Sequence, residues 1–152
     1  MYLWSNRLVY TGEVDVHDDI DLTLLLTHLA NCLNTVHGRA VRVESGRVTF
    51  QGGSLWVWSW NVLGPFGSGD LTVDAVTRHV RYRVSVLQLV LLATILVGIM
   101  AVSLVQESAP YQVLRCIPFA WALLIGGNLA IGIPRLQSFV RRSINSAPRL
   151  TR

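Results

Sequence analysis

Imidazole and thiol groups can bind a metal ion, and His28 and Cys32 stand four residues apart, a spacing that places both on one side of a helix. A zinc site needs three or four protein ligands. His17 lies before the helix predicted here, and His37, nine residues after His28, points in another direction. We therefore interpret His28 as a solvated helix residue and Cys32 as a residue at the edge of the core. We expect no metal and no cofactor.

Five carboxylates surround His17: Glu13, Asp15, Asp18, Asp19 and Asp21. Clustered carboxylates can bind a cation or act as acid and base. Their spacing does not match a calcium-binding loop, and a helix dipole favours acidic residues at the start of a helix in any case. We interpret the group as a strand with outward-facing acids, followed by a charged helix cap.

The glycine-rich segment 64–70, GPFGSGD, lacks the Gly-Lys-Ser/Thr ending of a phosphate-binding loop, and a strand rather than a helix is predicted after it. We therefore predict a turn. Cys32 and the serines stand in no recognisable nucleophile motif. The sequence thus offers no set of catalytic residues, and we do not expect an enzyme.

The charges are distributed very unevenly along the chain. Residues 84–134 contain only Glu107 and Arg115, whereas the chain as a whole is 14% charged and 51% hydrophobic. Residues 1–83 carry a net charge of −1 and residues 84–152 a net charge of +5. Because the basic excess lies around the apolar part, we do not expect nucleic acid as a partner.

Two apolar stretches are predicted to cross a membrane. The first, 84–105, has 22 uncharged residues, or about 33 Å of helix. A short turn, 106–112, leads to the second stretch, 113–134, whose uncharged part from Cys116 to Ile133 has 18 residues. Pro118 is expected in the first turn of this second helix, and Pro134 is expected to end it.

Arginines flank this predicted pair of spans on one side. Arg78, Arg81 and Arg83 precede it, five arginines follow Ile133, and the connecting turn carries Glu107. The positive-inside rule places both termini in the cytoplasm. We expect a multi-pass protein of a bacterial inner membrane.

Residues 1–83 predict a small cytoplasmic α+β domain of four to six mostly antiparallel strands, with one helix on one face. A strand is expected at 8–16, a helix from Asp18 to Gly38, and hairpins at 40–50 and 71–84, the last strand running directly into the first span. The helix carries an apolar stripe at helical spacing: Leu22, Leu25, Leu26, Leu29, Leu33 and Val36.

Three tryptophans occupy alternate positions of one further predicted strand: Trp56, Trp58 and Trp60. Alternate residues share a face of a strand. We favour a core position under the leucine stripe, which needs a large apolar partner. A position at the membrane surface and a platform for an aromatic ligand are the alternatives.

The second span and its tail carry two candidate contact surfaces. Gly126, Gly127, Asn128 and Ala130 would allow close helix contact, with Gln88 and Thr94 as hydrogen-bond partners for Asn128. The tail 135–152 is predicted either as an amphipathic helix on the inner leaflet, with Arg135, Arg141 and Arg142 near lipid headgroups, or as a plain basic flank.

From these features we expect a non-catalytic, membrane-tethered interaction or accessory module. Its partners would be the lipid bilayer and, through the spans, a second copy or another membrane protein. A subunit or self-assembling element of a transport or permeability system is the alternative, and a membrane enzyme comes third.

Overall fold

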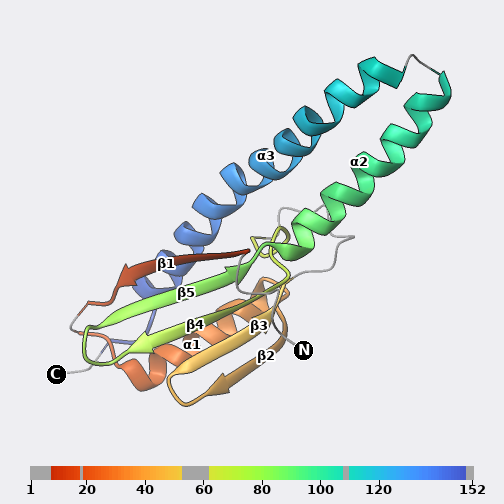
Figure 1. The fold of residues 1–152 in the computed structure, drawn as a ribbon. Helices are drawn as coiled ribbons and strands as arrows, with labels where there is room; N and C mark the ends of the chain where they lie inside the picture. The colour runs from red at the N-terminus through yellow and green to blue at the C-terminus, as the bar shows by residue number, and fades with distance from the viewer. Residues whose placement is uncertain (1–7, 18, 53–61, 108–109, 150–152) are drawn as a thin grey trace.

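The structure, a computed structural model, describes residues 8–17, 19–52, 62–107 and 110–149. These form an α+β fold with one five-stranded antiparallel sheet and three helices (Figure 1). In chain order the elements are β1 (Val9–Asp15), α1 (Leu22–Thr35), β2 (Arg39–Glu44), β3 (Arg47–Gln51), β4 (Ser68–Asp74), β5 (His79–Ser85), α2 (Leu87–Glu107) and α3 (Pro110–Asn145).

The strands lie in the order β1-β5-β4-β3-β2, so both predicted hairpins are confirmed. Glu44 pairs with Arg47 around the Ser45-Gly46 turn, where Gly46 has a positive φ of 76° that suits glycine. The glycine-rich segment is a turn only as far as Gly67, because β4 already begins at Ser68.

Helix α1 is confirmed, although its ends differ in detail from the prediction. Asp21 caps it, accepting hydrogen bonds from the amides of Thr23 and Leu24; Asp18 lies outside the described residues. At the other end His37, not Gly38, takes the left-handed conformation, with φ of 63°. Gly38 still contributes, because its amide donates to the carbonyl of Leu33 at 2.8 Å.

Helix α3 does not end at Pro134, so that prediction was wrong. It continues to Asn145, and Pro118 is its ninth residue rather than part of its first turn. A proline inside a helix removes one hydrogen bond and costs about 3 kcal/mol or more. Beyond Pro134, however, the helix buries Leu136, Val140 and Ile144. At about 1.5–3 kcal/mol for each buried side chain, this burial outweighs the proline.

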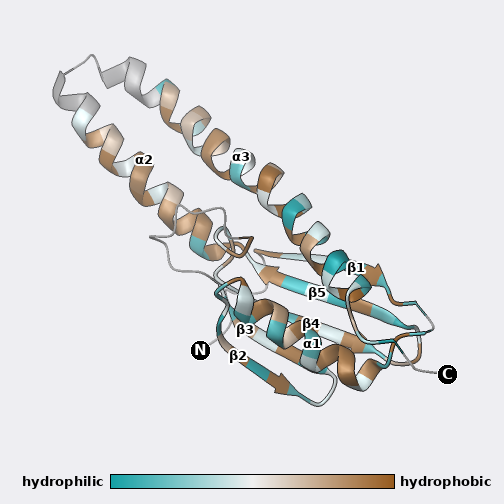
Figure 2. Ribbon diagram, turned by 180° about the vertical axis from the view of Figure 1, so that it is seen from behind, coloured by the Kyte–Doolittle hydropathy of each residue, from teal (hydrophilic) through white to brown (hydrophobic). Residues whose placement is uncertain are grey.

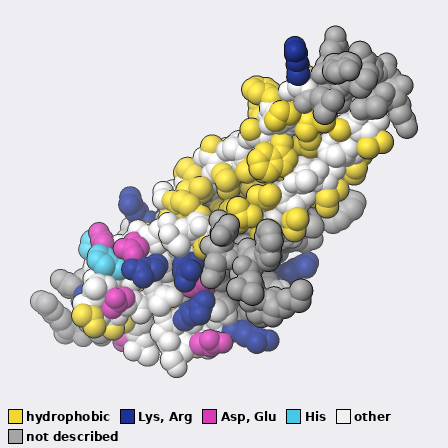
Figure 3. All heavy atoms as spheres, viewed as in Figure 1, with side chains coloured by type: hydrophobic (Ala, Val, Ile, Leu, Met, Phe, Trp, Pro, Cys, Tyr) yellow, Lys and Arg dark blue, Asp and Glu magenta, His cyan; other side chains and the backbone are white. Residues whose placement is uncertain are grey.

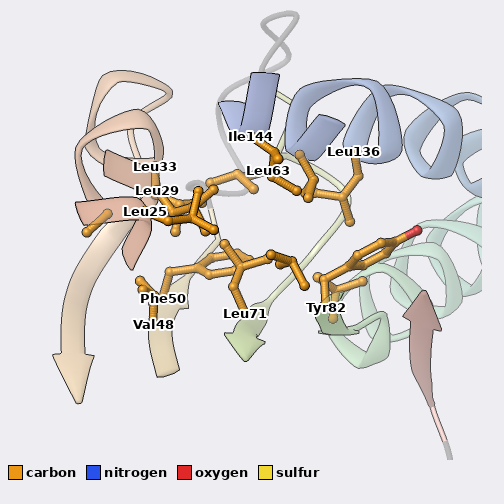
Figure 4. Close-up of a cluster of buried hydrophobic side chains, with 14 of the residues drawn as sticks. Leu25, Leu29, Leu33, Val48, Phe50, Leu63, Leu71, Tyr82, Leu136 and Ile144 are labelled. Carbon is orange, nitrogen blue, oxygen red and sulfur yellow. The ribbon is translucent and has the colours of Figure 1, made fainter. Parts of the chain in front are cut away.

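Two helical segments, rather than the predicted single helix, cover one face of the sheet (Figures 2 and 4). Helix α1 contributes Leu25, Leu29 and Leu33, and the end of α3 contributes Leu136, Val140 and Ile144. The sheet supplies Val48, Phe50, Leu71, Val80, Tyr82 and Val84. The apolar side of the tail therefore faces the core of the domain and not the inner leaflet.

The row of Trp56, Trp58 and Trp60 lies outside the described residues, so its place under α1 stays a prediction. In the described part of the chain, Val48, Phe50 and Leu71 face the leucine stripe (Figure 4). Beside them Tyr82 is packed over Gly12, where a Cβ would collide with its hydroxyl. A larger residue at position 12 would therefore have to displace the ring of Tyr82.

The buried end of α3 yields a stability prediction with a control in the same helix. Ile144→Ala should lower the free energy of unfolding of the full chain by about 2–5 kcal/mol, because it leaves a cavity in the core. Ile131→Ala removes the same atoms from a side chain that is 56% exposed, and its effect should be much smaller. Urea unfolding in detergent micelles, followed by far-UV circular dichroism, measures both. Equal losses would show that α3 is not part of the core.

Candidate functional site

Helices α2 and α3 leave the domain together and lie side by side (Figures 1 and 2). On α2, Leu89, Ala93 and Val97 are buried at four-residue spacing, and this row faces inward. Figure 3 shows apolar side chains over much of one side of the pair, and many other apolar side chains of the pair are exposed: Leu91, Ile95, Leu96, Ile99, Met100, Val102, Phe119, Trp121, Leu123 and Ile131. A largely apolar surface of this kind is typical of a membrane-embedded or partner-covered region.

Within the described part of the chain, one helical segment, Arg115–Asn145 within α3, is long and apolar enough to cross a membrane, as judged by length and composition. The apolar part of α2, Leu87–Ser103, falls just below the same length. The structure therefore supports a membrane association.

A hydrogen bond joins the two helices halfway along the pair. The indole Nε1 of Trp121 donates to Oγ1 of Thr94 at 3.0 Å, and Thr94 in turn donates to the carbonyl of Val90 at 2.8 Å. Sequence reasoning proposed Asn128 as the partner of Thr94 and missed Trp121. The amide of Asn128 instead donates to the carbonyl of Leu124 in its own helix, at 2.7 Å.

The predicted contact face on α3 divides into two parts. Gly126 and Ala130 are four residues apart and share one side of the helix, whereas Asn128, two residues from each, points roughly to the opposite side. All of them are exposed, as is Gly127, and apart from the neighbouring backbone of α3 itself no described atom lies within 4 Å of a Cβ placed at Gly126 or Gly127. Their role in helix contact stays a prediction, with the small residues as one surface and Asn128 as another.

The domain and the helix pair meet in a tight junction. Only Val86 separates β5 from α2. On the other side, a Cβ placed at Gly132 would lie 3.0 Å from Cγ of Pro65 and 3.6 Å from Cζ of Phe66. The turn that carries these two residues therefore packs directly against α3 where this helix enters the domain.

The sheet face that no described helix covers, the uncovered face, is polar and carries matched charges (Figure 3). Arg47 pairs with Asp70 at 3.0 Å, Arg81 with Glu13 at 2.7 Å, and His79 with Asp15 at 2.7 Å. The acidic group around His17 is thereby dispersed, since Asp19 reaches Arg149 at 3.3 Å and Asp21 caps α1. Among the described residues, no three histidine, cysteine or acidic side chains are grouped as a metal site requires.

The structure places His28 and Cys32 together, as their spacing predicted, and adds a residue that the sequence did not indicate. Nε2 of His28 lies 3.5 Å from Sγ of Cys32 and 3.1 Å from Oγ of Ser146, just beyond the end of α3. The hydroxyl of Ser146 also donates to the carbonyl of Ser143 at 3.1 Å. This arrangement links α1 to the end of α3, and we interpret it as structural.

Two side chains of the domain have shifted pKa values. Burial raises the pKa of Tyr82 above its ordinary value, and the side-chain amide of Gln137 partly opposes this by lowering the pKa of Tyr82. The same amide donates to the hydroxyl of the adjacent Tyr10 at 3.0 Å. The amides of Val76 and Thr77 lower the pKa of Asp74 in the β4–β5 turn. Tyr82 thus favours the folded state below its ordinary pKa, and this contribution is lost as the pH rises through the higher folded value. Asp74 behaves in reverse, losing its contribution as the pH falls through its lowered value.

No protein-family model, curated protein sequence or solved structure matches this chain. The function must therefore be inferred from the residues described above.

The junction gives a second prediction. Gly132→Leu should lower the free energy of unfolding by about 1–3 kcal/mol, because the new side chain must displace Pro65 or Phe66. Gly126→Leu makes the same change where no described neighbour is close, so it should be neutral or slightly stabilising. Thermal unfolding of the monomer in detergent would compare them. If Gly132→Leu is as stable as Gly126→Leu, the junction is not tightly packed.

Proposed function

We propose that the chain is a two-span membrane protein that holds a small, non-catalytic interaction domain against the cytoplasmic surface of a bacterial inner membrane. The domain would act as an accessory module for another membrane protein. One observation supports this arrangement most strongly: residues that precede α2 and residues near the end of α3 are buried in a single core.

The shared core limits the number of membrane crossings. Val80, Tyr82 and Val84 precede α2, whereas Leu136 and Ile144 lie near the end of α3, yet all five are buried in the same cluster. A chain whose two ends lie on one side of a membrane must cross it an even number of times. If α3 crosses, α2 must therefore cross as well.

The lengths of the helices are compatible with two crossings. Helix α2 has 21 residues, or about 31 Å. The uncharged part of α3, Cys116 to Ile133, gives about 27 Å, slightly less than a hydrocarbon core of about 30 Å. Local thinning of the bilayer or snorkelling of the flanking residues accommodates a short span at modest cost.

Charge supports the cytoplasmic orientation. The end of α3 and the segment after it carry the exposed Arg135, Arg141, Arg142 and Arg149 on the domain side, while Glu107 and Arg115 lie near the far end of the pair. The positive-inside rule then places the domain in the cytoplasm. Arg135 stands nearest the span, and Arg141 and Arg142 lie about 10 Å further along the helix, so Arg135 is best placed to contact headgroups.

An interaction role fits the surfaces that the fold leaves uncovered. The domain offers a polar sheet face with paired charges, and α3 offers Gly126 and Ala130 with open space around Gly126. The second surface also favours the alternative, in which copies of the chain assemble through their spans into part of a transport or permeability system.

Cysteine labelling tests the topology. In a chain with Cys32 and Cys116 replaced by serine, single cysteines would be placed at the exposed Ser45 and Asn145 in the domain and at Glu107 in the far half of the pair. A membrane-impermeant thiol reagent applied to intact cells should label Glu107→Cys alone, and all three after lysis. Opposite labelling of the two domain positions would contradict the even number of crossings. Labelling of both, without Glu107→Cys, would reverse the orientation.

Gentle detergent extraction followed by quantitative mass spectrometry tests the function. We expect one membrane protein to co-purify in a fixed ratio with the full chain. A homo-oligomer that conducts ions in a planar bilayer, with no second protein present, would instead establish the permeability alternative.

A further inference from the structure

Two open hollows adjoin on the uncovered face of the sheet, and they share Arg83. The first, of about 340 Å³, is lined by Arg47, Thr49, Ser68, Asp70, Arg83 and Ser85, among others. The second, of about 530 Å³, is lined by Thr11, Gly12, Glu13, Arg81 and Arg83. The strand register explains the shared residue, because Arg83 stands between Thr11 of β1 and Asp70 of β4.

Arg83 is the unbalanced charge of these hollows. The carboxylate of Asp70 pairs with Arg47, and that of Glu13 pairs with Arg81. Arg83 is exposed, and within the described part of the chain no carboxylate lies within ion-pair distance of it. The two hollows therefore carry a net charge of one positive unit, centred on a guanidinium that can bind two oxygens of one phosphate.

Hydroxyl groups surround this guanidinium on neighbouring strands. Ser68 and Ser85 are directly opposite each other in the register, one row nearer the helix pair than Arg83, and Thr49 and Thr11 lie in the same row as Arg83. Hydroxyl groups donate readily to phosphate oxygens. The combination of one unbalanced cation and several hydroxyls suits a singly charged phosphodiester.

The position of the hollows selects the source of that phosphate. Ser85 is the last residue of β5, and its hydroxyl lies 3.4 Å from the amide of Leu87, where α2 begins. Arginine side chains gather on this part of the domain, beside the base of the apolar helix pair (Figure 3). If the pair spans the bilayer, the hollow opens next to the headgroup layer.

We propose that Arg83 and the hydroxyls around it bind the phosphate of an anionic phospholipid such as phosphatidylglycerol. The proposal rests on the two-span arrangement proposed above. It assigns a lipid ligand to the uncovered sheet face. It also gives a role to the positive charge of Arg83, because the neighbouring carboxylates of Asp70 and Glu13 pair with other arginines. Asp70 would hold Arg47 in place beside the site, and the second hollow would accommodate the glycerol end of the headgroup.

Lipid selectivity of the full-length protein tests the proposal. The protein would be reconstituted in phosphatidylcholine vesicles with spin-labelled phosphatidylglycerol or spin-labelled phosphatidylcholine, and the motionally restricted fraction would be measured by electron paramagnetic resonance. Arg83→Gln should reduce the preference for phosphatidylglycerol about fivefold, the contribution expected of one arginine near a membrane surface. Arg42→Gln is the matched control, because Arg42 is exposed on the same sheet face but outside both hollows.

Each outcome decides the question. An equal effect of both substitutions, or no effect of Arg83→Gln, would overturn the proposal. Arg83→Lys keeps the charge but cannot bind two phosphate oxygens as a guanidinium does, so its preference for phosphatidylglycerol should lie between those of the wild type and Arg83→Gln. Displacement of the labelled lipid by inorganic phosphate at constant ionic strength would assign the site to free phosphate instead. Extraction of the wild-type protein from vesicles by alkaline carbonate would refute the membrane arrangement itself, whatever the lipid preference.

Discussion

Burial of the end of α3 against the sheet is the interaction on which the rest of the structure depends. Leu136, Val140 and Ile144 complete a core that α1 covers only in part. To reach that core, the helix must continue through Pro134 without a break. The same continuous helix therefore belongs both to the apolar pair and to the domain, and it fixes the orientation of the pair relative to the domain. With one residue between β5 and α2, the second connection is equally short.

This geometry gives the two faces of the sheet different surroundings. One face is buried under α1 and α3, and its core residues are apolar with the exception of the Tyr82 hydroxyl. The other face carries arginine and acidic residues, which pair across neighbouring strands. Such pairs on an exposed surface contribute little to stability. Their effect is instead to balance most of the charge, so that Arg83 remains distinct beside the helix pair.

The sequence was most informative where the pattern was local. Three patterns each reflect the side-chain environment of one segment: the period of two in both hairpins, the leucine stripe of α1 and the apolar stretches from residue 84 onward. The structure has the corresponding strands and helices at these places. It was least informative where a distant segment decides the outcome. Pro134 is an ordinary stop signal for a helix, and nothing near it shows that Leu136, Val140 and Ile144 have a sheet to pack against. The hydrogen bond from Trp121 to Thr94 and the contact of Ser146 with His28 likewise join residues far apart in the sequence.

The position of these three core residues at the end of α3 also determines the order of events during synthesis. When β5 leaves the ribosome, the leucine stripe of α1 has its sheet but not its second helical neighbour. The missing side chains become available only after both members of the apolar pair have been made. The domain therefore completes its folding only after the apolar pair has been synthesised, and a chain that stops within α3 leaves part of the core open to chaperones and proteases. In the membrane arrangement proposed above, insertion of the pair would precede completion of the domain.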